Sequence, residues 1–161
     1  MKTIKFPTLL LGIFALSCSP QSPKTDIVNE TFPETQSEIK ALVDNIFKDG
    51  AAKKLEELDA YHLNSPKFTR VEDSGLLSYE EGKVLEENFY GNYDIHNYDI
   101  HNHKVDVYGD IAISSFHIDM TASADLDTLD LKAKVSLTFA KDKGEWKIVH
   151  EHISQRLQSE N

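Results

Sequence analysis

The chain has 161 residues, 40% of them hydrophobic and 27% charged, which is the composition of one soluble domain with a buried core. The 27 acidic residues outnumber the 17 basic ones and give a formal net charge of -10 at pH 7. Because this charge repels phosphate groups, we expect neither nucleic acid nor an anionic membrane surface as a partner.

The first 17 residues have the layout of an export signal. Lys2 and Lys5 precede an apolar run over residues 8–16, and small residues stand just before Cys18. The run is far shorter than the about 20 apolar residues of a membrane-spanning helix, so we expect it to be cleaved. Cleavage would remove two lysines and no acid, and would change the formal charge from -10 to -12.

Cys18 is the only cysteine, and its position resembles that of the acylated cysteine of bacterial lipoproteins. The preceding Ala15-Leu16-Ser17 departs from the usual lipoprotein pattern, which has Leu where this chain has Ala15, and it also suits ordinary signal-peptidase cleavage. Because an unpaired thiol is a liability in an oxidising compartment, we expect Cys18 to be lipidated. The protein would then be anchored at the bacterial cell envelope by its lipid alone, and it would be secreted if Cys18 is not acylated.

Residues 18–34 contain three prolines and little periodic apolar pattern, which indicates an extended tether. We predict one domain over residues 35–157 and a short tail over 158–161. Thr35 and Glu38 have the spacing of a capping box, and apolar residues then recur at helical spacing up to Gly50.

Two further helices and a short strand are predicted before the chain changes its pattern. The second helix spans about residues 51–58, and the strand spans 68–71 before a turn at 73–75. Ser78 and Glu81 form another capping box, which opens a third helix that runs to about Tyr90.

Long strands dominate the rest of the chain, and we predict them over residues 99–108, 111–121, 130–140 and 146–155. Three helices followed by an antiparallel meander predict an α+β fold. A four-residue turn at 141–144 would pair Phe139 with Trp146, and further along Val135 with His150 and Ala133 with His152. We therefore expect His150 and His152 to point toward the helices.

The segment NYDIHNYDIHNH at 92–103 repeats five residues. An odd repeat places its two copies on opposite faces of a regular strand, so we expect no common surface, with the first copy in a loop or an irregular start of the strand. A three-residue turn at 108–110 would place His101, His103 and His117 on one face, an arrangement that can bind zinc. A two-residue turn would instead separate His117 from the other two, and the alternative is a polar sheet surface without metal.

The element order, with a short helix ending near Tyr61-His62 and strands closing on GEWKIVHEHIS, resembles the SnoaL-like branch of the nuclear transport factor 2-like superfamily over residues 35–157. The segments VYGDIAIS and KDKGEWKIVHEHIS also resemble the association domain of calcium/calmodulin-dependent kinases. The resemblance implies a strongly curved sheet wrapped around the helices as a cone-shaped, cystatin-like α+β roll, with a pocket at the wide end and a homodimer. The pocket arginine of the kinase domain is missing, because Lys134-Val135-Ser136 stands near its place, so we expect no anion binding of that kind.

The resemblance also implies acid/base residues deep in the cone, and the candidates here are Asp59, Tyr61, His150 and His152. An imidazole near its ordinary pKa of about 6.5 can exchange a proton at working pH. The predicted ligand-binding set is Tyr61, His62, Trp146, Phe139, His150 and His152. The alternative is that these side chains only fill the core.

Two functional hypotheses follow. The first is a non-catalytic module that binds a small apolar or amphipathic ligand, or a protein partner, in the cone. The second is an acid/base enzyme of the ketosteroid isomerase or dehydratase type. We expect no cofactor, since the chain has no glycine-rich phosphate loop and no pair of closely spaced cysteines.

Overall fold

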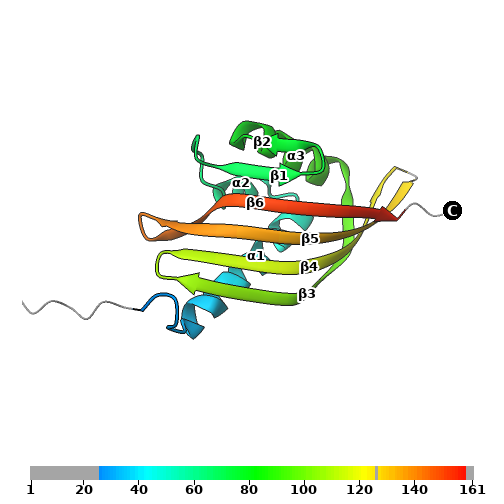
Figure 1. Ribbon diagram of the computed structural model, residues 1–161. Coiled ribbons are helices and arrows are strands. Elements are labelled where there is room, and N and C mark those ends of the chain that lie inside the picture. The colour runs from blue at the N-terminus through cyan, green and yellow to red at the C-terminus, as the bar shows by residue number, and fades with distance from the viewer. Residues whose placement is uncertain (1–25, 126, 159–161) are drawn as a thin grey trace, which may run out of the picture.

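The computed structural model describes residues 26–125 and 127–158, with side chains up to residue 155, and its fold is α+β as predicted (Figure 1). The helices are α1 Pro33–Ala51, α2 Leu55–Ala60 and α3 Tyr79–Asn92. The strands are β1 Thr69–Glu72, β2 Gly75–Leu77, β3 Asp94–Tyr108, β4 Ile111–Ala124, β5 Asp127–Asp142 and β6 Glu145–Gln158. Within these ranges no helix is long and apolar enough to cross a membrane. The predicted signal, Cys18 and the first part of the tether lie outside the described residues, as do residues 159–161 of the predicted tail.

The six strands form one sheet in the order β2-β1-β6-β5-β4-β3. Strand β1 runs parallel to β6, and all other neighbours are antiparallel. The sheet crosses over α1 and α2 (Figure 1). Its inner face meets the buried side of α1, and Ile39 and Val43 of α1 are fully buried, as are Phe139 and Ile148 of the sheet. Burial of each such side chain contributes roughly 1.5–3 kcal/mol to stability.

The helix starts differ in how they are capped. The Ser78–Glu81 capping box of α3 is confirmed, with each residue bonding the backbone N–H of the other. The box predicted at Thr35 is wrong, because α1 begins at Pro33, whose ring presets helical φ and needs no hydrogen bond at this position. The second helix begins at Leu55 rather than near residue 51, because Lys53 has a φ of 54°, which is not compatible with a right-handed helix.

The predicted register of the β5–β6 hairpin is wrong, because it depends on a turn and a bulge. The turn has two residues, Lys143 and Gly144, both with positive φ, and it pairs Phe139 with Ile148. A register shift of one residue follows, at Val149, so that Thr138 pairs with His150 and Ser136 with His152.

The shorter turn moves the pairing by two residues, which leaves each side chain of β6 on its predicted face. The bulge at Val149 then adds one residue, and the side chains that follow it lie on the opposite face from the one predicted. His152 therefore lies exposed on the outer face and His150 lies half-buried beside it, contrary to the prediction. The side chain that points inward between them belongs to Glu151, which is 3% exposed.

Two bulges in β3 determine which face of the strand each residue of the histidine-rich repeat occupies. A register shift at His96 lets Ile95 and Ile100 both face inward, opposite Ala122 and Ile118, so the expectation of opposite faces is wrong. The two copies of the repeat thus contribute to the same apolar surface.

The three histidines that a three-residue turn would have placed on one face do not share a face. The β3–β4 turn has two residues, but a bulge with Asn102 at a φ of 53° brings His101 opposite His117, with ring centroids 5.4 Å apart. The same bulge turns His103 to the inner face, where its Nε2 lies 2.8 Å from Oγ of the buried Ser114. Two histidines on one face and one on the other cannot share an ion.

Candidate functional site

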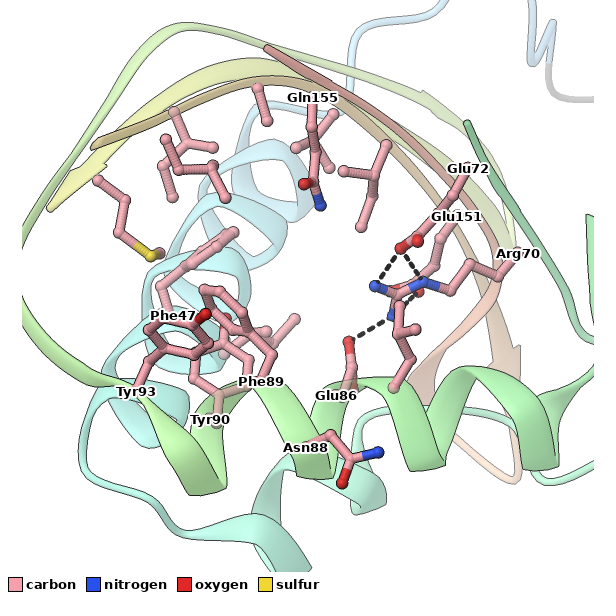
Figure 2. A pocket seen from close by; sticks show the side chains of 18 of the residues that line it. Phe47, Arg70, Glu72, Glu86, Asn88, Phe89, Tyr90, Tyr93, Glu151 and Gln155 are labelled. Carbon is pink, nitrogen blue, oxygen red and sulfur yellow. Dashed lines mark hydrogen bonds and ion pairs between the residues drawn. The ribbon is translucent and has the colours of Figure 1, made fainter. Parts of the chain in front are cut away.

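A cavity of about 450 Å³ lies between α3 and the inner face of the sheet. The curved sheet arches over it and α3 lies along the opposite side (Figure 2). Most of its wall is apolar or aromatic, including Phe47, Phe89, Ile118, Met120, Leu131 and Val135. A cavity of this size lies within the range that holds small organic ligands.

Charged side chains from separate elements meet at one side of this cavity. Arg70 of β1, Glu86 of α3 and Glu151 of β6 line it, and His62, which follows α2, lies behind them in contact with Glu151. Parallel pairing places Arg70 directly beside Glu151, and the bulge at Val149 turns Glu151 inward. Gly82 of α3 leaves room for the arginine, since a Cβ there would lie 3.3 Å from Arg70 Cδ.

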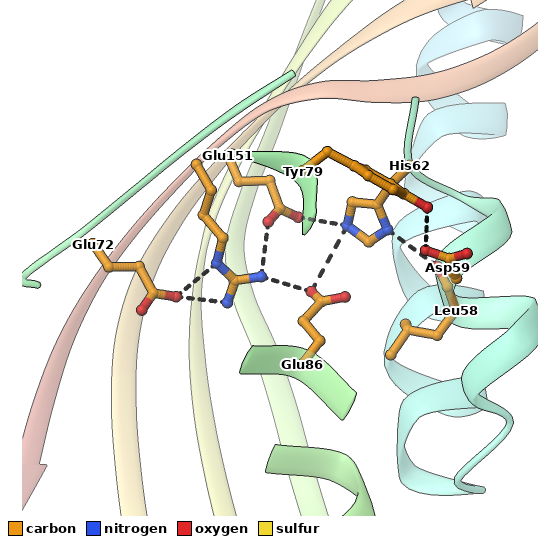
Figure 3. A network of polar contacts seen from close by, with 8 residues as sticks. Leu58, Asp59, His62, Glu72, Tyr79, Glu86 and Glu151 are labelled. Atoms are coloured by element: carbon orange, nitrogen blue, oxygen red, sulfur yellow. Dashed lines mark hydrogen bonds and ion pairs between the residues drawn. The ribbon is translucent and has the colours of Figure 1, made fainter. Parts of the chain in front are cut away.

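Arg70 is the centre of the cluster, and the carboxylates of Glu72, Glu86 and Glu151 are labelled in Figure 3. Its Nε donates to Glu72 Oε1 at 2.7 Å, and its Nη1 donates to Glu86 Oε1 at 2.9 Å and to Glu151 Oε2 at 3.0 Å. The arginine side chain is only 6% exposed. Charge-assisted hydrogen bonds to three carboxylates hold the guanidinium in one orientation, and burial makes each of them stronger than at a surface.

His62 completes the cluster from the other side. Its Nδ1 lies 3.1 Å from the carbonyl oxygen of Leu58 and therefore donates, while its Nε2 lies 3.0 Å from Glu151 Oε1. Burial alone would lower the pKa of His62, but the charges of Glu86 and Glu151 outweigh it and raise the pKa to about 9. His62 is thus a buried imidazolium at neutral pH.

The two inner carboxyl groups have opposite pKa shifts. Burial, together with the charge of Glu151, raises the pKa of Glu86. Burial opposes the ionisation of Glu151 as well, but hydrogen bonds and charge from His62 and Arg70 outweigh it, so the pKa of Glu151 is lowered. Of these two carboxyl groups, Glu86 is therefore the one that takes up a proton more readily.

Glu86 and Tyr90, one helical turn apart on α3, leave polar atoms unpaired. Glu86 uses Oε1 for its contacts, and its second oxygen has no hydrogen bond to any described residue. Tyr90 is 8% exposed, its ring packs against Gly50, and its hydroxyl likewise has no partner among the described residues. Both residues line the cavity, so a ligand there would find two polar groups available.

His62, Glu86 and Glu151 each offer a ligand atom, and these atoms lie within 4.8 Å of one another, which is close enough for a metal ion. Arg70, however, already donates to both carboxylates from 2.9 Å and 3.0 Å. An ion would have to displace this guanidinium or lie beside it at close range. The residues therefore fit an ion-pair cluster better than a metal centre.

Of the predicted site residues, only His62 belongs to this cluster. Asp59 lies behind it, where it accepts hydrogen bonds from Tyr79 at 2.5 Å and Lys83 at 2.7 Å (Figure 3). Tyr61 donates to Asp49 at 2.7 Å, which together with burial raises the pKa of Tyr61 to about 12.

The remaining predicted ligand-binding residues also lie outside the cavity. Trp146 donates from Nε1 to Glu38, and Phe139 is completely buried in the core. His150 and His152 lie on the outer face. Lys134 is exposed on that face too, and the arginine that the sequence seemed to lack is supplied to the cavity by β1.

Arg70, Glu72, Glu86 and Glu151 were missed from the sequence. One signal was present for Arg70: it stands two residues after the buried Phe68, and such spacing places both on one face of a strand. For Glu151 the alternation of the sequence points the wrong way, because the bulge at Val149 cannot be seen in it.

The fold is that of nuclear transport factor 2-like proteins. A protein of this kind from Cytophaga hutchinsonii superposes with a TM-score of 0.62 at 14% identity, over 74% of this chain and 97% of that one. A Streptomyces avermitilis protein assigned as a dehydratase of the same family gives 0.67 at 16% identity, over 79% and 100% of the two chains. A Xanthomonas campestris protein assigned as a calcium/calmodulin dependent protein kinase II association domain gives 0.62 at 19% identity, over 74% and 86%.

A family profile for the SnoaL-like domain matches residues 39–158. The chain therefore belongs to the SnoaL-like domain family, as the sequence resemblance indicated. No curated protein matches the chain significantly. The structural likenesses, all below 20% identity, establish the fold and leave the activity to be argued from the site.

Proposed function

We propose that the domain binds a small amphipathic molecule in the cavity between α3 and the sheet. The observation that carries this proposal is the division of the wall into an apolar part and a charged part. Aromatic side chains such as Phe89 and Tyr93 lie across the cavity from Arg70 and Glu86 (Figure 2). A ligand with an apolar body and one polar end would satisfy both parts.

A cavity-filling substitution tests the proposal. Ala133 lines the cavity from β5, and Ala133→Leu would occupy part of the space. With the uncharged fluorescent probe N-phenyl-1-naphthylamine we expect saturable binding to the unmodified protein and an affinity about tenfold lower in the variant. Ala41→Leu, at an exposed position of α1, is the matched control. Absence of probe binding, or equal affinities in both variants, would overturn the proposal.

Acid/base catalysis without a cofactor is the second candidate, and the position of Glu86 favours it. A carboxyl group that lines an apolar cavity and has a raised pKa is a better proton acceptor than an exposed carboxylate, and it can return the proton to a ligand in the cavity. This role would fall to Glu86 rather than to His150 or His152. Deuterium uptake at the α-carbon of 4-phenyl-2-butanone, followed by NMR, tests it: exchange should be lost in Glu86→Gln and kept in Glu87→Gln.

We further propose that the domain works at the bacterial cell envelope, anchored by a lipid on Cys18. The support is the pattern of residues 1–18 alone. In cells that process lipoproteins, the unmodified protein should be found in the membrane fraction and Cys18→Ser in the soluble exported fraction. Equal partition of the two would show that Cys18 carries no anchor.

A homodimer formed through the outer face of the sheet also remains a proposal. Ile111 and Ile113 are each more than a third exposed on that face, beside Tyr108. Sedimentation equilibrium should give twice the chain mass, and Ile113→Lys should shift the protein toward the monomer by placing like charges opposite each other.

A further inference from the structure

The charges that meet in the cavity do not balance. Arg70 and the imidazolium of His62 supply two positive charges, and Glu72, Glu86 and Glu151 supply three negative ones when all are ionised. Among the described residues, Arg70 is the only cationic side chain that lines the cavity, and His62 lies behind Glu151. When Glu86 is ionised, one negative charge is left without a partner beside a largely apolar space, and burial together with the charge of Glu151 raises the pKa of Glu86. A cation bound beside Glu86 would favour its ionised form.

The excess charge is centred on Glu86. Both oxygens of Glu151 are occupied, one by Arg70 and one by His62. Glu86 has one oxygen bonded to Arg70 and the other unpaired among the described residues. Tyr90 also lines the cavity, and its hydroxyl has no hydrogen bond to a described residue. The unpaired carboxylate oxygen and the hydroxyl are both able to accept a hydrogen bond.

A positively charged end group would correct the imbalance. An ammonium group has three donors and one positive charge, so it can bond the free oxygen of Glu86 while it neutralises the cluster. A carboxylate in the same place would add a second uncompensated negative charge. An alcohol could donate one hydrogen bond but would leave the charge unchanged.

We propose that the cavity selects amphipathic amines, with the ammonium group at Glu86 and the apolar body against the aromatic wall. The inference rests on the proposed ligand-binding function and adds the chemical class of the ligand. Glu72 also lines the cavity, and its second oxygen, which has no hydrogen bond to a described residue, would add to the attraction.

The test uses the full-length chain and three probes of the same shape. 4-Phenylbutylamine, 4-phenylbutanol and 4-phenylbutyrate displace N-phenyl-1-naphthylamine at about pH 8, where a primary amine is still charged. We expect the amine to displace the probe at about tenfold lower concentration than the alcohol, and the carboxylate to be the weakest. Equal displacement by amine and alcohol would overturn the inference, whereas absence of naphthylamine binding would instead overturn the proposed function.

Matched variants locate the charge that is responsible. Glu86→Gln keeps a carbonyl oxygen for Arg70 but removes the charge, so the preference for amine over alcohol should disappear. Glu87→Gln makes the same change in net charge at a side chain that is 44% exposed, and it should keep the preference. A preference that survives Glu86→Gln would contradict the assignment. If Glu86→Gln does not fold, the three probes on the unmodified protein still decide.

Discussion

The two ends of the sheet's inner face are built from the same strands, but one end is apolar core and the other lines a charged cavity. Near the β5–β6 turn, Phe139, Trp146 and Ile148 are buried in the hydrophobic core. Beyond the bulge at Val149, β6 presents Glu151 to the interior, and β5 and α3 enclose a cavity. A single inserted residue therefore separates a closed apolar core from an open charged site.

This difference has a physical cause. Before the bulge, alternate residues of β6 are apolar and can be buried without compensation. After it, the inward position is a carboxylate, whose burial requires partners. Arg70 and His62 provide them, and they come from segments that β1 and the turn after α2 bring beside β6.

Removal of bulk should affect the closed end most. Phe139→Ala leaves a void where no solvent can enter, and we expect a loss of about 3–5 kcal/mol in the free energy of unfolding by urea. Ile153→Ala truncates a half-buried side chain at the cavity, where we expect about 1 kcal/mol. Similar losses at the two positions would mean that the cavity end is packed as tightly as the core.

Removal of the central cation should be the largest effect at the open end. Arg70→Met leaves three carboxylates facing one another, so we expect a loss of about 3 kcal/mol at neutral pH. The loss should shrink as the pH falls and the carboxylates become protonated. Lys132→Met removes a cation from an exposed ion pair with Asp119, and it should change the stability by less than about 1 kcal/mol.

The stability contributed by His62 should depend on pH. Its folded pKa of about 9 lies above its ordinary value of 6.5, so the contribution is complete below about pH 6.5 and is lost as the pH rises through 9. We expect the difference in unfolding free energy between the protein and His62→Gln to be on the order of 2 kcal/mol at pH 6 and to decline toward pH 10. The exposed His96→Gln should show no such decline, and a rising difference would mean that His62 is buried neutral.

We expect the smallest change in stability from a substitution in the β5–β6 turn. Gly144 has a φ of 91°, so Gly144→Ala should cost about 1 kcal/mol of stability through backbone strain. Gly91 lies inside α3 with open space around its Cα, and Gly91→Ala should stabilise the helix slightly. The midpoint temperature of thermal unfolding should fall in Gly144→Ala and rise in Gly91→Ala. Equal shifts in the two variants would argue against a strained turn.

Periodicity was sufficient to predict much of the architecture. The Ser78–Glu81 box marked the start of α3, and the change from helical to alternating pattern marked the long strands. It could not predict β2, which has only three residues. It also failed for the candidate site: the expected inward faces of His150 and His152 are wrong, and the role of His62 in ligand binding stays a prediction.

By itself, the sequence determined the order and type of the long elements, because burial of apolar residues at fixed spacing dominates local choice. The tertiary structure alone decided which residues enter the cavity. At the bulges at His96, Asn102 and Val149, the side chains that follow lie on the opposite face of the strand from the one that simple alternation predicts. These bulges belong to the pairing of two strands, so they are seen only in the folded sheet. Arg70 and Glu151, 81 residues apart, become neighbours only through the parallel pairing of β1 with β6.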